Sequence, residues 1–120
     1  MKESLQEIPG TLSLVNDLKK KGFKIALFSN VRPLQAATIK ETGHYDLFSS
    51  VILSYEIKAK KPQRKAFKIL LERLKAKPKE CLFIDNAEEN VQAAKSFGIE
   101  SIKFESLEQL KGELKKRGLL

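Results

Sequence analysis

Apolar residues are concentrated in four short runs, and longer amphipathic segments separate these runs. The runs are bounded by turn residues and are too short for helices; they cover residues 24–29, 51–53, 81–84 and, more weakly, 101–104. Three of them are continuously apolar instead of alternating with polar residues. This pattern is typical of strands that are covered on both faces, as in a parallel sheet between two helix layers.

The segments between these runs space their apolar residues at helical intervals. Helices are predicted over residues 11–21, ended by Gly22, and over residues 33–41, with Pro33 in the first turn. The remaining helices carry the apolar stripes Phe67, Leu70, Leu71 and Leu74; Val91, Ala94 and Phe97; and Leu107, Leu110 and Leu114. Pro62 is predicted to open the first of these three. Ser106 and Gln109 form a capping-box pattern before the last one.

Helices and strands therefore alternate along the whole chain, and no linker, repeat or low-complexity tract interrupts them. Such alternation predicts an α/β fold. We expect one domain over residues 1–120, built as a three-layer, Rossmann-like parallel sheet of about four strands with helices on both faces. Ligands of such sheets bind beyond the carboxyl ends of the strands, so the loops at residues 29–32, 54–62 and 85–88 are the candidate site.

The three loops carry polar side chains, and those of the first two loops have an ordinary structural interpretation as well as a functional one. Ser29 and Asn30 follow a predicted strand and either bind an anion or cap the next helix. Lys61 either neutralises an anionic substrate or is a solvated member of a basic run. Asp85 ends a strand, where a carboxylate can reach Mg²⁺. A capping box between Asn86 and Glu89 would leave Asp85 free for that role.

The composition narrows the class of protein. The 120 residues include 23 Lys+Arg against 15 Asp+Glu, a net charge of +8, and 42% of the residues are hydrophobic. This mixture is typical of a soluble globular domain. Residues 1–4 do not resemble the start of a signal peptide, and no apolar run approaches the length of a membrane span. With a single cysteine, Cys81, and a single histidine, His44, we expect a cytoplasmic protein without disulfides or a cysteine-ligated zinc site.

Taken together, the three loops resemble the motifs of the haloacid dehalogenase (HAD) superfamily of hydrolases. The similarity covers residues 8 to about 104. It includes Leu27-Phe28-Ser29-Asn30, like the second family motif, Lys61-Pro62, like the third, and residues 82–91, like the fourth. In this family an aspartate attacks a phosphoryl group or, more rarely, a carbon that bears a halogen. The resemblance makes Ser29 and the Asn30 backbone phosphate binders, Lys61 a catalytic residue, and Asp85 a Mg²⁺ ligand.

The sequence departs from the family pattern in two ways. The fourth motif often carries paired aspartates, but the second position here is Asn86, a weaker metal ligand. The first motif, a strand ending in Asp-x-Asp that contains the nucleophile, has no counterpart in residues 1–7, and the usual cap segment is missing too. Asp17 and Asp46 are predicted to lie away from the carboxyl ends of the strands. We therefore expect a truncated core that is inactive alone.

Three functions follow as hypotheses. The first is a Mg²⁺-dependent phosphatase-type core acting on a phosphorylated or other anionic small molecule. Its missing central strand would be closed by direct pairing, or supplied by a partner or a second copy. The second is a non-catalytic binding or scaffold domain of the same fold. The third, nucleic-acid binding, ranks lowest, because no aromatic platform accompanies the basic residues. No membrane partner is expected.

Overall fold

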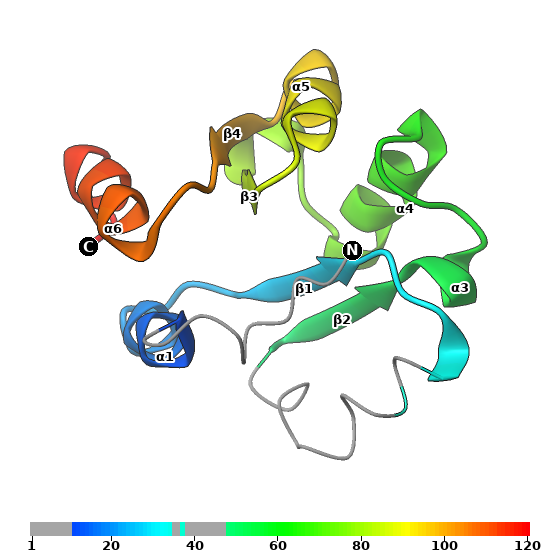
Figure 1. The fold of residues 1–120 in the computed structure, drawn as a ribbon. Coiled ribbons are helices and arrows are strands. Elements are labelled where there is room, and N and C mark those ends of the chain that lie inside the picture. Colours follow the sequence, from blue (N-terminus) through cyan, green and yellow to red (C-terminus); the bar gives the residue numbers. More distant parts are fainter. Residues whose placement is uncertain (1–10, 35–36, 38–47) are drawn as a thin grey trace. The chain divides into compact units, whose positions relative to one another are not determined.

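The computed structural model describes residues 11–34, 37 and 48–120 (Figure 1). The chain divides into two compact units, residues 1–58 and residues 59–120. Its elements are α1 (Thr11–Lys20), β1 (Ala26–Ser29), β2 (Ser50–Leu53), α3 (Ser54–Ile57), α4 (Arg64–Leu74), η3 (Pro78–Glu80), β3 (Leu82–Asp85), α5 (Glu88–Ser96), β4 (Glu100–Lys103) and α6 (Leu107–Lys116). The single domain expected over residues 1–120 stays a prediction.

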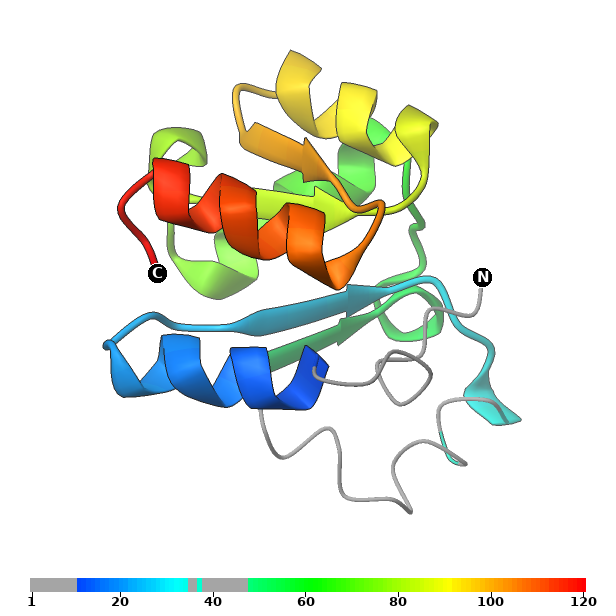
Figure 2. The same cartoon turned by 60° about the vertical axis from the view of Figure 1, so that its left-hand side comes forward.

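The first unit is built on β1 and β2, which pair in parallel from Ala26 opposite Ser50 to Ser29 opposite Leu53. Helix α1 runs alongside this pair (Figure 2). It buries Leu14 and Val15 and ends before Gly22, whose φ of +96° is the left-handed conformation expected there. Most of the helix predicted over residues 33–41 lies outside the described residues.

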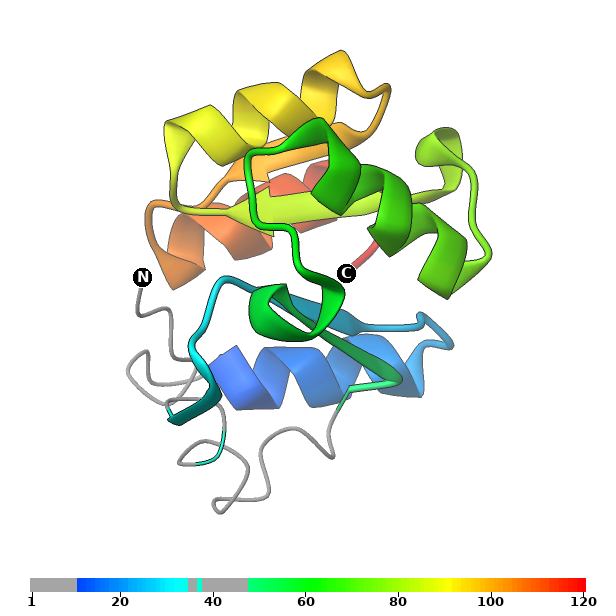
Figure 3. The same ribbon diagram turned by 90° about the vertical axis from the view of Figure 1, so that its right-hand side faces the viewer.

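The second unit is built on β3 and β4, which pair in parallel from Leu82 opposite Glu100 to Asp85 opposite Lys103. Helices α4 and α6 cover opposite faces of this pair, as the two rotated views show (Figures 2 and 3). Helix α5 contacts both strands. Helices therefore lie on both faces of β3 and β4, as the continuously apolar runs predict.

Phe67 of α4 forms the centre of the second unit's core and is fully buried. Its ring meets Phe83 of β3 edge-to-face, with the centroids 5.4 Å apart, and lies 6.4 Å from the ring of Phe97, which follows α5. Ile99 and Leu114 are almost fully buried as well. This cluster joins α4 and β3, the two elements on either side of the candidate site.

The predicted α/β class is confirmed: in the described part of the chain, strands that pair in parallel within each unit are combined with helices. The strands are hydrogen-bonded as two pairs, so one sheet joining all four stays a prediction. Two local predictions were wrong. Residues 54–57, predicted to be loop, form α3 with Ile57 buried. Helix α4 begins at Arg64 and not at Pro62, because Gln63 first closes a turn with Lys60 through two hydrogen bonds.

Candidate functional site

A buried ion pair joins the two loops at the carboxyl end of β3. The Lys61 ammonium nitrogen lies 2.7 Å from Oδ2 of Asp85, and the two side chains are only 4% and 2% exposed. Asp85 is the last residue of β3, and Lys61 precedes α4. Because a buried charge is costly unless it is paired, each residue compensates the charge of the other inside the fold.

Two further hydrogen bonds fix the Asp85 carboxylate. Its Oδ1 accepts the backbone N–H of Ala87 at 2.9 Å, and its Oδ2 accepts the side-chain amide of Asn90 at 3.3 Å. The first of these bonds replaces the capping box predicted between Asn86 and Glu89. The N-cap of α5 is Ala87, which makes no side-chain cap hydrogen bond. The Asp85 carboxylate instead accepts the backbone N–H of Ala87 in the turn that leads into the helix.

Asn90 is a site residue that the motif comparison missed. It is 4% exposed and lies in the first turns of α5, whereas Asn86 is exposed. A sequence signal for Asn90 does exist. Together with Ala94 and Phe97 it has the spacing i, i+4, i+7, so it is a polar residue on an apolar stripe. A buried amide in such a place requires a polar partner, and Asp85 provides it.

The turn before α4 places Lys61 against the core. Gln63 donates its N–H to the carbonyl of Lys60, and its side chain accepts the N–H of Lys60, so the chain doubles back around Lys61. The peptide bond between Lys61 and Pro62 is cis. The ammonium lies 5.7 Å from the centre of the Phe83 ring, whose face attracts a cation. Lys61 is therefore held by β3, and its interpretation as a solvated member of a basic run is wrong.

Ser29 and Asn30 lie in the first unit, at the carboxyl end of β1. The chain directly after them is fastened by Ser54, the first residue of α3. The Ser54 hydroxyl accepts the N–H of Val31 at 2.9 Å and donates to the carbonyl of Val31 at 3.1 Å. Ser54 thus fixes the loop at residues 29–32, a role that the sequence did not indicate. A pocket shared by Ser29, Lys61 and Asp85 stays a prediction.

The donor atoms around Asp85 do not fit the Mg²⁺ ion that the resemblance implies. Mg²⁺ binds one or two carboxylates in near-octahedral geometry and keeps several of its waters. Asp85 is instead buried against a lysine, and its neighbour Asn86 is neutral and exposed.

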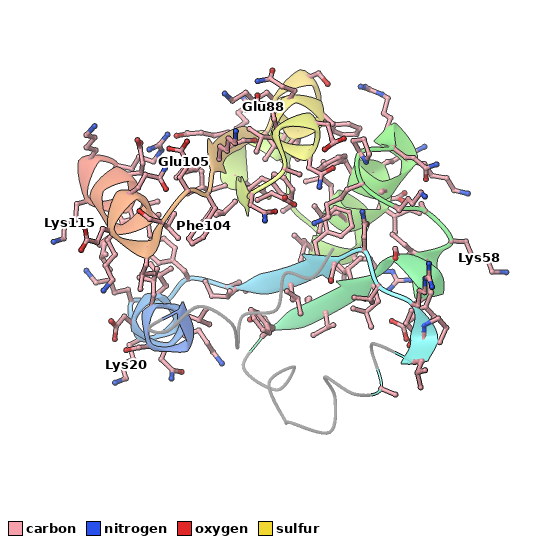
Figure 4. All side chains as sticks on the ribbon, viewed as in Figure 1. Lys20, Lys58, Glu88, Phe104, Glu105 and Lys115 are labelled. Carbon is pink, nitrogen blue, oxygen red and sulfur yellow. The ribbon has the colours of Figure 1, made fainter. Side chains whose placement is uncertain are left out.

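The exposed basic residues are spread over many elements. Lys20 at the end of α1, Lys58 after α3 and Lys115 in α6 all project outward from the ribbon (Figure 4). Such lysines are typical of solvated helix surfaces.

Among the helices of the described residues, none combines the length and the apolar character needed to cross a bilayer.

Comparison with known proteins identifies the family of this chain. The model of the haloacid dehalogenase-like hydrolases matches residues 1–98, most of the chain. The chain belongs to this family. A phosphorylated carbohydrates phosphatase from Thermotoga maritima is 30% identical over 103 residues, which are 83% of this chain and 47% of that protein. A glyceraldehyde 3-phosphate phosphatase from Methanothermobacter thermautotrophicus is 29% identical over 100 residues, which are 82% and 44% of the two chains.

Solved structures of the HAD family support the fold. A HAD family enzyme from Bacteroides thetaiotaomicron, solved as its magnesium complex, has a TM-score of 0.78 at 28% identity and covers 87% of this chain and 56% of that one. The same enzyme with magnesium and inorganic phosphate has a TM-score of 0.73 at 29% identity, over 80% and 52% of the chains. This chain spans less than half the length of the curated relatives named above.

Proposed function

We propose that this chain is the core of a phosphatase-type HAD hydrolase that binds a phosphorylated or other anionic small molecule. The observation that carries the proposal is the buried pair of Lys61 and Asp85 at the carboxyl end of β3. Parallel α/β sheets bind their ligands at this end. The names of two relatives support the substrate class, because both describe phosphatases of phosphorylated carbohydrates or glyceraldehyde 3-phosphate.

Each predicted residue has a distinct role in this proposal. Lys61 donates to a phosphoryl oxygen and stabilises the negative charge that develops there. The hydroxyl of Ser29 and the backbone N–H of Asn30 bind further oxygens of the same group. Asp85 holds Lys61 in place. No step is assigned to Mg²⁺, because the donor atoms described around Asp85 do not fit that ion.

The covalent nucleophile of the family has no candidate in the sequence. Besides Asp85, the aspartates are Asp17, which lies in α1, and Asp46, which lies outside the described residues. Neither belongs to an Asp-x-Asp motif. Loss of a covalent nucleophile lowers turnover by a factor on the order of 10⁶ in enzymes that depend on one. We therefore propose that these 120 residues bind phosphate without hydrolysing its esters.

The nucleophile would then come from residues outside this sequence, whether a partner or another segment. Among the described strands, β3 is hydrogen-bonded to β4 alone, so its other edge can accept a strand that carries a carboxylate. The second candidate function is a non-catalytic binding domain of the same fold, which the neutral Asn86 favours. Addition of a synthetic peptide that contains an Asp-x-Asp strand distinguishes the binding domain from the hydrolase core, since turnover of an aryl phosphate would appear only for the hydrolase core.

Phosphate binding by the full chain tests the proposal. Inorganic phosphate should raise the melting temperature of the wild-type protein, and Lys61→Gln or Ser29→Ala should reduce this shift. Lys60→Gln is the matched control, because it removes the same charge from the adjacent, exposed residue. Equal loss of binding in Lys60→Gln and Lys61→Gln would reduce the effect to net charge and overturn the proposed site.

A further inference from the structure

The carboxylate of Asp85 has little capacity left for another ligand. A carboxylate offers about four lone-pair positions. Three of them are used here: Oδ2 accepts from Lys61 and from Asn90, and Oδ1 accepts from Ala87. The side chain is also only 2% exposed, whereas Mg²⁺ keeps several of its waters when it binds a carboxylate.

The charge at this position is also balanced already. The Lys61 ammonium, 2.7 Å from Oδ2, compensates the single negative charge of Asp85. A divalent cation on Oδ1 would lie within a few ångströms of that ammonium, inside a region from which water is largely excluded. Like charges repel strongly in such surroundings, because the effective dielectric constant is low. The ammonium of Lys61 would therefore oppose binding of Mg²⁺ at this carboxylate.

We infer that Asp85 and Asn90 are positioning residues for Lys61, and that this chain binds its anion without a divalent cation. The inference rests on the proposed phosphate site and specifies its chemistry. Lys61 supplies the positive charge for the phosphoryl group, Asp85 keeps the ammonium directed, and Asn90 keeps the carboxylate of Asp85 in place. The magnesium that was bound to the Bacteroides thetaiotaomicron enzyme would have no counterpart on these residues.

Asn86 and Asn90 form a matched pair for testing this inference. Both are asparagines near the start of α5, and both are within five residues of Asp85. Asn90 is buried and donates to Oδ2, whereas Asn86 is exposed. If Asp85 were a metal ligand with Asn86 beside it, Asn86→Ala would be the damaging change. If Asp85 positions Lys61, Asn90→Ala is the damaging change and Asn86→Ala is neutral.

The first experiment uses Mg²⁺ alone and needs no substrate. The NMR signals of the Lys61 ammonium and the Asp85 carboxyl carbon are followed during a titration with MgCl₂ to millimolar concentration. Both should stay unchanged in the wild-type protein. Asn90→Ala should shift or broaden the ammonium signal, and Asn86→Ala should leave it in place. A Mg²⁺-dependent shift of the Asp85 signal that Asn86→Ala abolishes would overturn the inference. If Asn90→Ala does not fold, the wild-type titration still decides.

The second experiment measures binding of inorganic phosphate in EDTA and in MgCl₂. The dissociation constant should be the same in both solutions and should rise severalfold in Asn90→Ala but not in Asn86→Ala. Phosphate binding that requires Mg²⁺ would contradict this inference and leave the proposed function intact. A chain that binds no phosphate in either solution would remove the proposed function, while the titration with Mg²⁺ alone still tests the assignment of Asp85.

Discussion

Lys61 and Asp85 are 24 residues apart in the sequence, yet their charged atoms lie 2.7 Å apart in the interior of one unit. Both side chains are almost fully buried, so water contributes little to stabilising either charge. Lys61→Met should therefore leave an uncompensated carboxylate and lower the free energy of unfolding by about 3–5 kcal/mol. The apolar double variant Lys61→Met/Asp85→Leu should recover most of this loss.

Urea unfolding of the single and double variants measures these changes. Lys103→Ala is the control, because it removes an ion pair with Glu88 that is 3.7 Å long and lies at the surface. This variant should unfold like the wild type. A Lys61→Met protein as stable as the Lys103→Ala protein would show that the buried pair is not essential to the fold.

The aromatic cluster predicts the next result. Phe67→Ala removes the ring that contacts both Phe83 and Phe97 and leaves a cavity at a fully buried position. The free energy of unfolding should fall by about 3–5 kcal/mol. Lys68→Ala changes the exposed neighbour and should have little effect. The comparison is made by thermal unfolding, and equal melting temperatures for the two variants would contradict the assigned core.

Ser54→Ala should loosen the loop after β1. The substitution removes both hydrogen bonds to Val31 and leaves its partly buried N–H without this acceptor. A loss of about 1–2 kcal/mol is expected. Hydrogen exchange of the Val31 amide should be faster in Ser54→Ala and unchanged in Ser49→Ala, which alters an exposed serine just before β2. Unchanged exchange in both variants would exclude this role for Ser54.

The start of α6 gives a prediction for helix capping. The Ser106 hydroxyl accepts the N–H of Gln109 at 3.1 Å, which confirms the serine half of the predicted capping box. The Gln109 side chain accepts instead from Glu105. Ser106→Ala should cost about 1 kcal/mol. Ser96→Ala, in the last turn of α5, should change stability by less than about 0.5 kcal/mol in the same urea titration.

Cys81 provides a prediction on pH dependence. Burial raises the pKa of the Cys81 thiol above its usual value, and the negative charge of Glu80 raises it further. A raised pKa means less thiolate at neutral pH, so iodoacetamide should alkylate Cys81 more slowly than an unstructured cysteine peptide. The rate should increase as the pH rises toward the thiol pKa.

Mass spectrometry of the alkylated protein follows this rate. Glu80→Gln keeps the oxygen that accepts from Lys77 and removes only the charge, so it should accelerate alkylation at a given pH. Glu72→Gln, which changes an exposed glutamate of α4, should not. A Cys81 that reacts as fast as the free peptide would contradict the raised pKa.

Local sequence patterns were sufficient to predict most elements but not their partners. Strand β3 was predicted over residues 81–84 and lies at Leu82–Asp85. The prediction was close because the strand is a continuous apolar run that polar residues follow directly. Helix α3 has only four residues, too few for a period to be visible. The bond from Asp85 to Ala87 was missed because Asn86 and Glu89 form a plausible capping pattern, and only the fold shows that Asp85 takes its place.

The same limit applies to the site residues: the sequence indicated Lys61 and Asp85 but not that they contact each other. Lys61 and Asp85 were predicted as separate charges on two loops, and Lys61, taken singly, had an ordinary structural explanation as a solvated lysine. Their pairing depends on a contact between segments 24 residues apart, which periodicity does not report. Asn90 was missed for a related reason. Its hydrogen bond to Asp85 depends on the turn between β3 and α5, which brings the start of the helix close to the end of the strand.

The tether between Lys61 and Asp85 also links recognition to folding. It closes a segment that contains all of α4 and most of β3, so Lys61 and Asp85 cannot separate widely without disturbing the packing of Phe67 on Phe83. Occupation of the site by an anion should then slow amide exchange throughout this segment and not only near the ligand. Binding of an anion should therefore be detectable as an increased resistance of this segment to unfolding.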